Sequence, residues 1–240
     1  MPGKPRSTAR RADNYFAHTQ RPLNCLVFVL PLLVTFHVGA ALYGTSLLVP
    51  HYLLRFLQYF GAGGTFLPPL LIVVVLLLQH LGRRDPWKIH WAALVGMVAE
   101  SLVLTIPLIV LARLAGQAAP AAAPSAANST LVALGAGIYE EFIFRLMFVS
   151  LVMLLLVDVF GLRKEVIEVL AVVGGAVVFS LCHFSPAQVF GGEPFDWGTF
   201  ILLTLAGILW GGAYVIRGFG IAVGSHVLWD LYVFFFCAKP

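Results

Sequence analysis

The chain has 240 residues, of which 60% are hydrophobic and only 11% are charged, and its mean hydropathy is +0.93. Soluble domains carry about 25% charged residues, so this composition excludes an ordinary soluble protein and indicates an integral membrane protein. The formal net charge is +4, but no basic face with interleaved aromatic residues predicts nucleic-acid binding. Cys25, Cys182 and Cys237 lie far apart without a CxxC pair, which suggests neither a disulfide framework nor a thiolate metal site.

About seven apolar segments are long enough to cross a bilayer, which takes roughly 17–25 residues of helix. The expected spans run over 23–49, 65–81, 89–114, 131–157, 166–184, 199–216 and 219–237. An aromatic stretch at 51–60, which contains Arg55, is either an interfacial segment or one more short helix. These segments predict an all-α fold, a polytopic membrane helical bundle of about seven or eight transmembrane helices.

Polar and basic segments between the spans predict the domain limits and the orientation. The expected parts are an N-terminal tail at 1–22, N-terminal transmembrane helices at 23–115, an Ala/Pro-rich loop at 116–130 and a C-terminal transmembrane core at 131–240. Lys and Arg concentrate in the tail and in the turns at 80–91 and 158–168, whereas the loop at 185–198 has two acids and no base. The positive-inside rule therefore places the N-terminus in the cytoplasm, provided that 51–60 does not cross the membrane. We expect a multi-pass protein of the bacterial inner (cell) membrane.

The most unusual stretch reads GAGIYEEFIFRLMFVS and places Glu140, Glu141 and Arg145 inside an apolar run. One charge at the bilayer centre costs roughly 2.5–3.5 kcal/mol on membrane-insertion scales, so three charges need a compensating reason. Glu141 and Arg145 are four residues apart and can form an ion pair on one helix face. Glu140 lies about 100° round the helix, without a local partner. All three could be structural, but an unpaired intramembrane carboxylate predicts a functional site.

Two further polar clusters lie in later apolar segments. VFSLCHFSP carries His183 four residues after Phe179, and GSHVLWDLY carries His226 four residues before Asp230. Each has a structural interpretation: His183 as a helix-end histidine bonded to a backbone carbonyl, and His226 with Asp230 as a hydrogen-bonded pair. Together with Glu140, however, two imidazoles and a second acid supply what hydrolysis requires, namely a base for water and donors for an oxyanion.

The ordered motifs EExxxR, FxxxH and HxxxD resemble the CPBP family, which contains the CAAX prenyl proteases and bacteriocin-processing enzymes and is also called the Abi family. In this chain the motifs are formed by Glu140, Glu141 and Arg145, by Phe179 and His183, and by His226 and Asp230. The resemblance covers about 131–237, so 131–240 is expected to be a CPBP-like catalytic core. It implies a glutamate-dependent intramembrane endopeptidase that cuts near the C-terminus or membrane segment of a membrane-associated protein or peptide.

The resemblance also implies roles for the residues. Glu140 would be the general base that activates water, and His183 would hold or polarise that water. His226 and the residue at position 230 would stabilise the oxyanion, while the ion pair of the first motif would support the site. The best-known CAAX proteases have Asn where this chain has Asp230. An ionised Asp cannot donate a hydrogen bond, so Asp230 is either protonated or orients His226.

Other interpretations stay open. Glu140, His183, His226 and Asp230 have enough ligand atoms for a catalytic zinc with three protein ligands, whereas the resemblance implies catalysis without a metal or other cofactor. A non-enzymatic protein for binding or bacteriocin immunity, or a transporter, could use the same pocket. The expected partners are a membrane-associated protein or peptide substrate and the lipid bilayer, with no nucleic acid, and the sequence does not define the oligomeric state.

One acid in the spans is left outside the predicted catalytic set. Glu100 could pair with Arg145, line the substrate entry, or form a bundle-stabilising hydrogen bond to a neighbouring helix.

Overall fold

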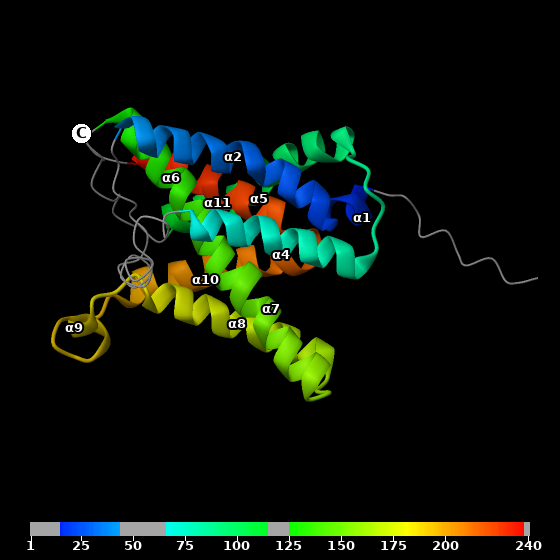
Figure 1. The fold of residues 1–240 in the computed structure, drawn as a ribbon. Helices are drawn as coiled ribbons and strands as arrows, with labels where there is room; N and C mark the ends of the chain where they lie inside the picture. Colours follow the sequence, from blue (N-terminus) through cyan, green and yellow to red (C-terminus); the bar gives the residue numbers. More distant parts are fainter. Residues whose placement is uncertain (1–14, 44–65, 115–124, 238–240) are drawn as a thin grey trace, which may run out of the picture.

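The computed structural model describes residues 15–43, 66–114 and 125–237, and every regular element in these ranges is helical. The elements are α1 (Tyr15–Thr19), α2 (Pro22–Tyr43), α4 (Leu67–Arg83), α5 (Trp91–Leu114), α6 (Ala126–Glu141), η2 (Phe142–Met147), α7 (Phe148–Met153), η3 (Leu154–Val159), α8 (Lys164–Leu181), α9 (Pro186–Val189), α10 (Trp197–Arg217), α11 (Phe219–Tyr232) and η4 (Val233–Cys237), where η marks a π-helix. The long helices pack as a bundle, and α7 and α8 extend from it as an arm (Figure 1). The expected all-α class is confirmed.

Five helical stretches of the described residues are long and apolar enough to cross a membrane. They are Pro22–Tyr43, Trp91–Leu114, Ala126–Val159, Trp197–Arg217 and Phe219–Cys237. Helix α4 is apolar but has only 17 residues, and α8 has 18 residues with charged side chains in its first turns. By length and composition the described residues therefore support five spans, and the expected count of seven or eight is not confirmed. The aromatic stretch at 51–60 lies outside the described residues.

Side-chain caps start two helices earlier than hydropathy predicts. Ser125 accepts a hydrogen bond from the backbone N–H of Asn128 at 3.2 Å, and α6 begins directly after this serine. Residues 126–130 are therefore helical, which corrects the expected loop at 116–130. Asp196 caps α10 in the same way. A cap satisfies backbone N–H groups that a helix start leaves unpaired, an effect that hydropathy does not register.

The connections between helices are tighter than expected. The turn predicted at 158–168 occupies only 160–163, because η3 and α8 extend into it from both sides. The loop predicted at 185–198 contains the short helix α9. Gly218 alone joins α10 to α11, with a φ of 103°, and a Cβ at this position would lie 2.7 Å from a backbone oxygen of α1. Only glycine fits this turn without strain.

Helix α11 lies at the centre of the bundle. Its residues 219–227 are all buried, and it packs against α2, α5, α6 and α10. Two glycines allow this close approach, since Gly220 faces Met97 and Gly224 faces Ser101. Small residues are typical of closely packed membrane helices. Helix α11 can therefore carry polar side chains into a site that it shares with several neighbours.

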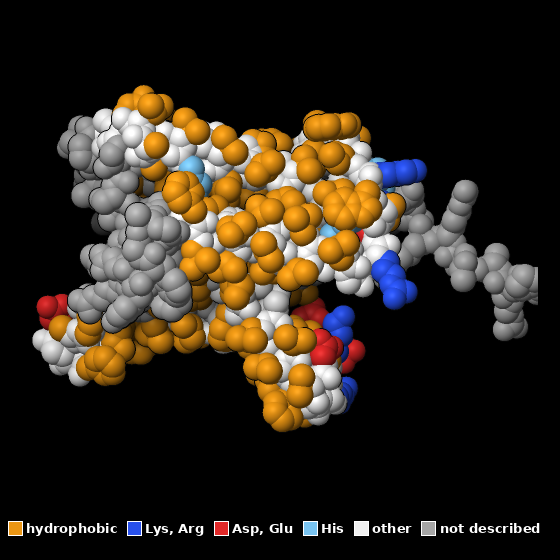
Figure 2. Space-filling model, in the orientation of Figure 1, with side chains coloured by type: hydrophobic (Ala, Val, Ile, Leu, Met, Phe, Trp, Pro, Cys, Tyr) orange, Lys and Arg blue, Asp and Glu red, His pale blue; other side chains and the backbone are white. Residues whose placement is uncertain are grey.

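The outer surface of the described bundle is apolar. On α4, for example, Leu70, Val74 and Leu78 are exposed, whereas Ile72 and Leu76 are buried in the core. Figure 2 shows hydrophobic side chains over most of the visible face, with Lys and Arg gathered at its edges. Soluble monomers rarely expose so much contiguous apolar surface. The apolar helices and this surface indicate an integral membrane protein, because lipid tails can cover such a surface without loss of hydrogen bonds.

Candidate active site

The hairpin of α6–η3 with α8 sets the depth of two polar side chains. In an antiparallel helical hairpin, residues equally distant from the turn lie at about the same level. Glu140 precedes the turn at 160–163 by as many residues as His183 follows it, and α7 packs along α8. This hairpin therefore brings Glu140 and His183 to one level of the membrane domain.

The hairpin of α10 with α11 aligns a second pair. Trp210 and His226 are equally distant from Gly218, the turn residue. Their rings stack with centroids 3.7 Å apart and an interplanar angle of 9°. Trp210 is 1% exposed and His226 is 3% exposed. The imidazole of His226 is thus held flat against a buried indole.

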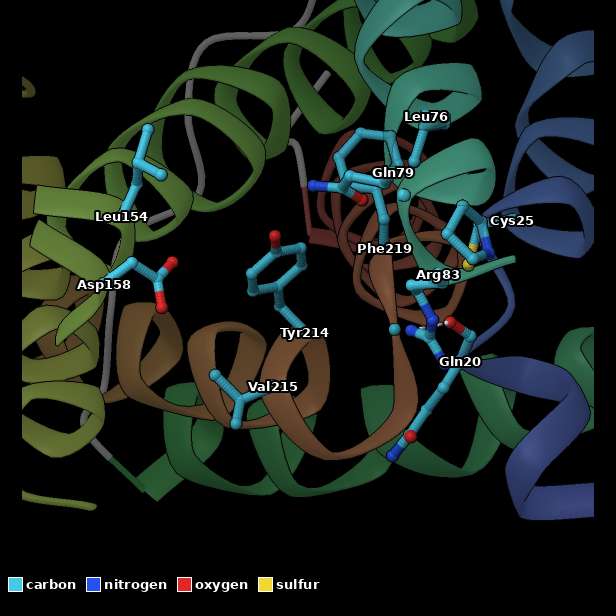
Figure 3. A pocket seen from close by; sticks show the side chains of 13 residues that line it. Gln20, Cys25, Leu76, Gln79, Arg83, Leu154, Asp158, Tyr214, Val215 and Phe219 are labelled. Atoms are coloured by element: carbon cyan, nitrogen blue, oxygen red, sulfur yellow. Dashed lines mark hydrogen bonds between the residues drawn. The ribbon is translucent and has the colours of Figure 1, made fainter. Parts of the chain in front are cut away.

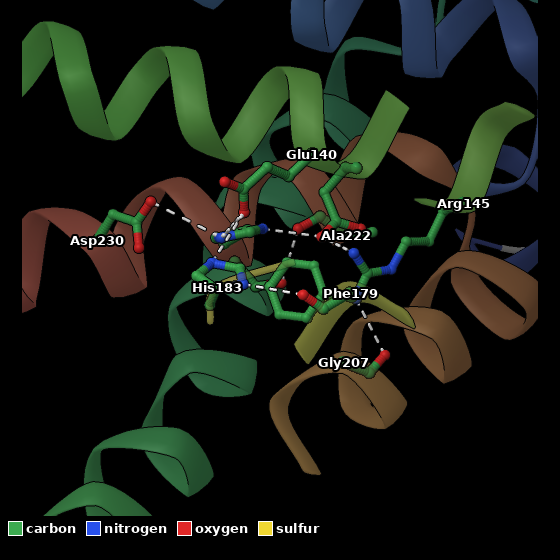
Figure 4. A network of polar contacts seen from close by, with 10 residues as sticks. Glu140, Arg145, Phe179, His183, Gly207, Ala222 and Asp230 are labelled. Atoms are coloured by element: carbon green, nitrogen blue, oxygen red, sulfur yellow. Dashed lines mark hydrogen bonds and ion pairs between the residues drawn. The ribbon is translucent and has the colours of Figure 1, made fainter. Parts of the chain in front are cut away.

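Glu140 faces both imidazoles (Figure 4). Its Oε2 atom lies 3.7 Å from Nε2 of His226 and 4.0 Å from Nε2 of His183. Oδ2 of Asp230 lies 3.7 Å from the same nitrogen of His226. These separations exceed direct hydrogen-bond lengths but are within the reach of a single bridging water molecule. The structure brings together the four residues that the sequence predicts as catalytic.

Glu141 anchors the buried side of this cluster. Its Oε1 atom lies 2.9 Å from Nη1 of Arg145 and 2.8 Å from Nδ1 of His226, and its side chain is fully buried. Since an ionised carboxylate can only accept hydrogen bonds, we assign the imidazole hydrogen to Nδ1 of His226. The other ring nitrogen, Nε2, faces Glu140. The predicted ion pair of Glu141 and Arg145 is present, while the contact with His226 had no signal in the sequence.

Arg145 is enclosed on several sides, which allows a guanidinium to lie within the bundle. Its Cζ atom lies 4.8 Å from the ring centroid of Phe179 and 5.7 Å from that of Trp210. Its Nη2 group donates a hydrogen bond to the carbonyl oxygen of Gly207 at 3.1 Å. The ion pair, this carbonyl and the two ring faces together offset the cost of removing the charge from water. Arg145 therefore holds α6–η2 against α8 and α10.

His183 is the most accessible member of the cluster. It lies just beyond the end of α8, and its side chain is 36% exposed. Its Nδ1 donates to the carbonyl oxygen of Phe179 at 2.9 Å. The ring is bonded to a backbone carbonyl, as the structural interpretation expects, and it also directs its other nitrogen toward Glu140.

The π-helix η2 begins directly after Glu141 and contains Arg145. A π-helix has a wider turn than an α-helix, and such turns are frequent at functional sites. Before this turn, α6 packs against α2 and α11; after it, α7 and η3 pack against α8. The wider turn therefore lies where the long helix changes partners, at the level of the polar cluster.

Gly137 allows α6 to approach α11 one turn before the two glutamates. A Cβ at this position would lie 2.8 Å from the backbone nitrogen of Val227 and 3.0 Å from its Cα. Backbone atoms cannot turn aside, so Gly137→Ala is expected to lower the free energy of unfolding by about 1–3 kcal/mol. Unfolding of the purified variant measures this loss. Gly174→Ala is the matched control, since a Cβ there meets nothing within 4 Å, and equal losses in both variants would contradict the assigned close approach.

Glu100 belongs to a separate cluster. Nη2 of Arg217 donates to its Oε2 at 2.8 Å, and the hydroxyl of Tyr15 donates to the same oxygen at 2.7 Å. Burial, followed by the contact with Glu100, raises the pKa of Tyr15 to about 12, so this hydroxyl keeps its proton. A pairing of Glu100 with Arg145 is therefore wrong, and the acid instead joins α5 to α1 and to the end of α10.

The donor geometry was compared with that of a zinc site. Among the residues that the structure describes, no group of three or more His, Cys, Asp or Glu side chains is placed to hold a metal ion. The nearest approach is at His226, whose Nε2 has Glu140 and Asp230 oxygens each 3.7 Å away. A catalytic zinc takes three protein ligands and one open position. The roles given below are those of the chain's own side chains.

The fold and the site together define a class of protein: a membrane-embedded helical domain with a buried carboxylate–imidazole cluster. Residues 122–232 match the family model described as type II CAAX prenyl endopeptidase Rce1-like. This match is consistent with the CPBP resemblance, and the matched segment contains the whole cluster from Glu140 to Asp230. The family is one of proteases, which supports peptidase activity. No curated protein and no solved structure gives a significant match to the chain.

Proposed function

We propose that this chain is an intramembrane endopeptidase in which Glu140 activates the attacking water. The observation that carries the proposal is the position of Glu140, with its Oε2 within 4.0 Å of an imidazole nitrogen of both His183 and His226. Three polar side chains around one space, within a protease family domain, can hold a water molecule and a scissile amide together.

The reaction can be written with these side chains alone. Glu140 takes a proton from water, and the oxygen attacks the carbonyl carbon of the scissile amide. His183 orients that water through Nε2, because its Nδ1 is already bonded to a carbonyl. Glu140 then gives the proton to the amide nitrogen, the C–N bond breaks, and a carboxylic acid and an amine leave. The accessible position of His183 leaves room for water to enter.

His226 is proposed to stabilise the oxyanion, with Asp230 orienting it. Nδ1 of His226 is bonded to Glu141, so the ring can donate toward an oxyanion only from a protonated Nε2. In that state, Glu141 lies beside Nδ1 of the ring and Asp230 lies beside Nε2. Asp230 therefore need not donate a hydrogen bond itself, which accounts for Asp at a position where the best-known relatives have Asn.

The proposed substrate is a membrane-associated protein or peptide that is cut near its C-terminus or its membrane segment. The cluster lies inside a bundle with an apolar outer surface, so a substrate held by the bilayer is already concentrated beside it. The proposed location is a bacterial inner (cell) membrane, and the distribution of Lys and Arg supports an orientation with the N-terminus in the cytoplasm.

The test is a comparison of membrane-protein C-termini in cells that lack the gene and carry either the wild-type chain or Glu140→Gln. The proposal expects one or more new C-termini with the wild-type chain that are missing with the variant. Those proteins then serve as substrates for the purified enzyme. If the variant restores every C-terminus, the pocket serves binding or immunity and not hydrolysis.

Removal of metal separates the proposed mechanism from the zinc-dependent alternative. Purified protein treated with a strong chelator is expected to keep its full rate of cleavage, because the proposed base is a carboxylate. Metal analysis of the same sample accounts for a tightly held ion. Loss of activity on chelation, with recovery on addition of zinc, would contradict catalysis without a metal.

Trp210 is proposed as a positioning residue for His226, through the ring stack. Trp210→Leu is expected to reduce the rate of cleavage about tenfold, which corresponds to the upper range of aromatic pair energies. Trp210→Phe retains a flat ring and should lose less. The ratio of the two rates is the readout, measured at several pH values because the stack holds a titratable ring. Equal rates for both variants would remove this role.

A further inference from the structure

A cavity lies away from the polar cluster, between α4, η3 and α10. It has a volume of about 640 Å³, in the range of small-molecule sites, and none of the cluster residues lines it. Figure 3 shows the side chains that point into it, from Leu76 and Arg83 on one wall to Leu154 and Asp158 on the other. Helix α4 packs mainly on α2, so the wall formed by η3 stands apart from it and the cavity lies between them.

The cavity is located at one end of the bundle. Helices α4, η3 and α10 all end beside it, and the start of α2 also borders it. Trp87 and Lys88 follow the end of α4, and both are exposed. Tryptophan and basic residues concentrate at the membrane–water interface. The cavity mouth is therefore at the depth of lipid headgroups.

The mouth carries one cation and one anion on opposite walls. Nη1 of Arg83 donates to the carbonyl oxygen of Gln20 at 3.0 Å, and its Nε lies 3.0 Å from Asp85, yet 43% of its side chain is exposed. Asp158 is exposed and makes no ion pair with any residue that the structure describes. A ligand with one negative and one positive group matches this pair better than a simple anion does.

The interior changes from polar to apolar away from the mouth. The hydroxyl of Tyr214 lies 2.8 Å from Oγ of Ser150. The side-chain amide of Gln79 donates a hydrogen bond to the same Oγ atom at 3.5 Å. Leu76 and Leu154 complete the walls. A charged mouth, hydroxyl and amide groups behind it, and apolar walls follow the order of headgroup, ester linkages and acyl chains in a phospholipid.

We propose that this cavity binds a phospholipid whose headgroup carries both a phosphate and a primary ammonium, with the phosphate at Arg83 and the ammonium at Asp158. The ester region would lie against Tyr214 and Gln79, and the acyl chains would leave between α4 and η3. A primary ammonium can donate hydrogen bonds to the Asp158 carboxylate, which a quaternary ammonium cannot. This site is independent of the proposed hydrolysis.

The experiment is native mass spectrometry of the purified full chain with phosphatidylethanolamine, phosphatidylcholine or phosphatidylglycerol of identical acyl chains. Phosphatidylethanolamine is expected to bind about tenfold more tightly than phosphatidylcholine, because it alone adds a charge-assisted hydrogen bond. Asp158→Asn should remove this preference. Gly82→Leu should reduce binding of phosphatidylethanolamine, since Gly82 lines the cavity and its Cβ would enter open space.

Two variants serve as matched controls. Glu165→Gln removes an exposed carboxylate of α8 that does not line the cavity, and Gly174→Leu adds the same side chain where a Cβ also meets nothing within 4 Å. Both should bind phosphatidylethanolamine as the wild type does. Equal binding of the choline and ethanolamine lipids, or unchanged binding in Asp158→Asn and Gly82→Leu, would overturn the proposal. Recovery of a bound peptide in place of lipid would also overturn it.

Discussion

Replacing Glu140 with glutamine is expected to slow peptide cleavage by about 10²–10⁴-fold, the contribution typical of a general base. The amide has nearly the same size as the carboxylate, but it cannot take a proton from water. It can still face the two imidazoles from the same position, so the fold should be retained. The measurement is the initial rate of cleavage by the purified variant, with its unfolding temperature recorded alongside.

Glu165→Gln is the control for this change, because it replaces an exposed carboxylate on α8 outside the cluster. It should leave the rate unchanged. His183→Ala should lose activity in the same direction as Glu140→Gln, since both side chains border the proposed water. A Glu140→Gln variant that cleaves as fast as the wild type would show that another group activates the water.

The second large effect is on stability, at the buried ion pair. Arg145→Ala leaves the carboxylate of Glu141 uncompensated at zero exposure, and breaking a buried pair costs about 3–5 kcal/mol. Whole domains are stable by only about 5–15 kcal/mol, so the variant should unfold at markedly lower temperature or denaturant concentration. Replacing both partners, as in Glu141→Gln with Arg145→Met, should cost less than Arg145→Ala because no charge of the pair remains unpaired. Unfolding of the purified variants measures these losses.

An exposed ion pair in the same chain provides the control. Nε of Arg83 lies 3.0 Å from Asp85, with side-chain exposures of 43% and 18%. Because surface pairs contribute only about 0–1 kcal/mol, Asp85→Ala should be nearly neutral for unfolding. Similar losses for Asp85→Ala and Arg145→Ala would mean that the buried pair does not stabilise the bundle.

Much of the fold follows from hydropathy. The final expected span at 219–237 coincides with α11 and η4, and α4, α5, α8 and α10 begin and end within a few residues of their predicted limits. Helix α6 begins earlier, at its cap, and the short helices α1 and α9 were not predicted. Long apolar runs have one solution in a bilayer, because backbone groups must be bonded within the helix. The pair of Glu141 and Arg145 was predictable for a related reason, since four residues along a helix is a local relation.

The remaining features depend on contacts between distant parts of the chain. The bond of Glu141 to His226 joins α6 to α11, and nothing local to either helix encodes it. The π-turn at η2 is likewise absent from hydropathy. The sequence contains one signal for the stack of Trp210 on His226: the two residues are equally far from Gly218 along the chain. This signal is informative only when Gly218 is recognised as the turn of a helical hairpin.

The most direct measurement is photo-crosslinking of Glu140→Gln with a substrate that carries a photoreactive residue beside the scissile bond. Mass spectrometry of the adducts shows which side chains surround that bond. We expect adducts around positions 140, 183 and 226, from three separate segments of the chain. Adducts confined to the cavity between α4 and η3, or to any surface that excludes these positions, would contradict the proposed active site.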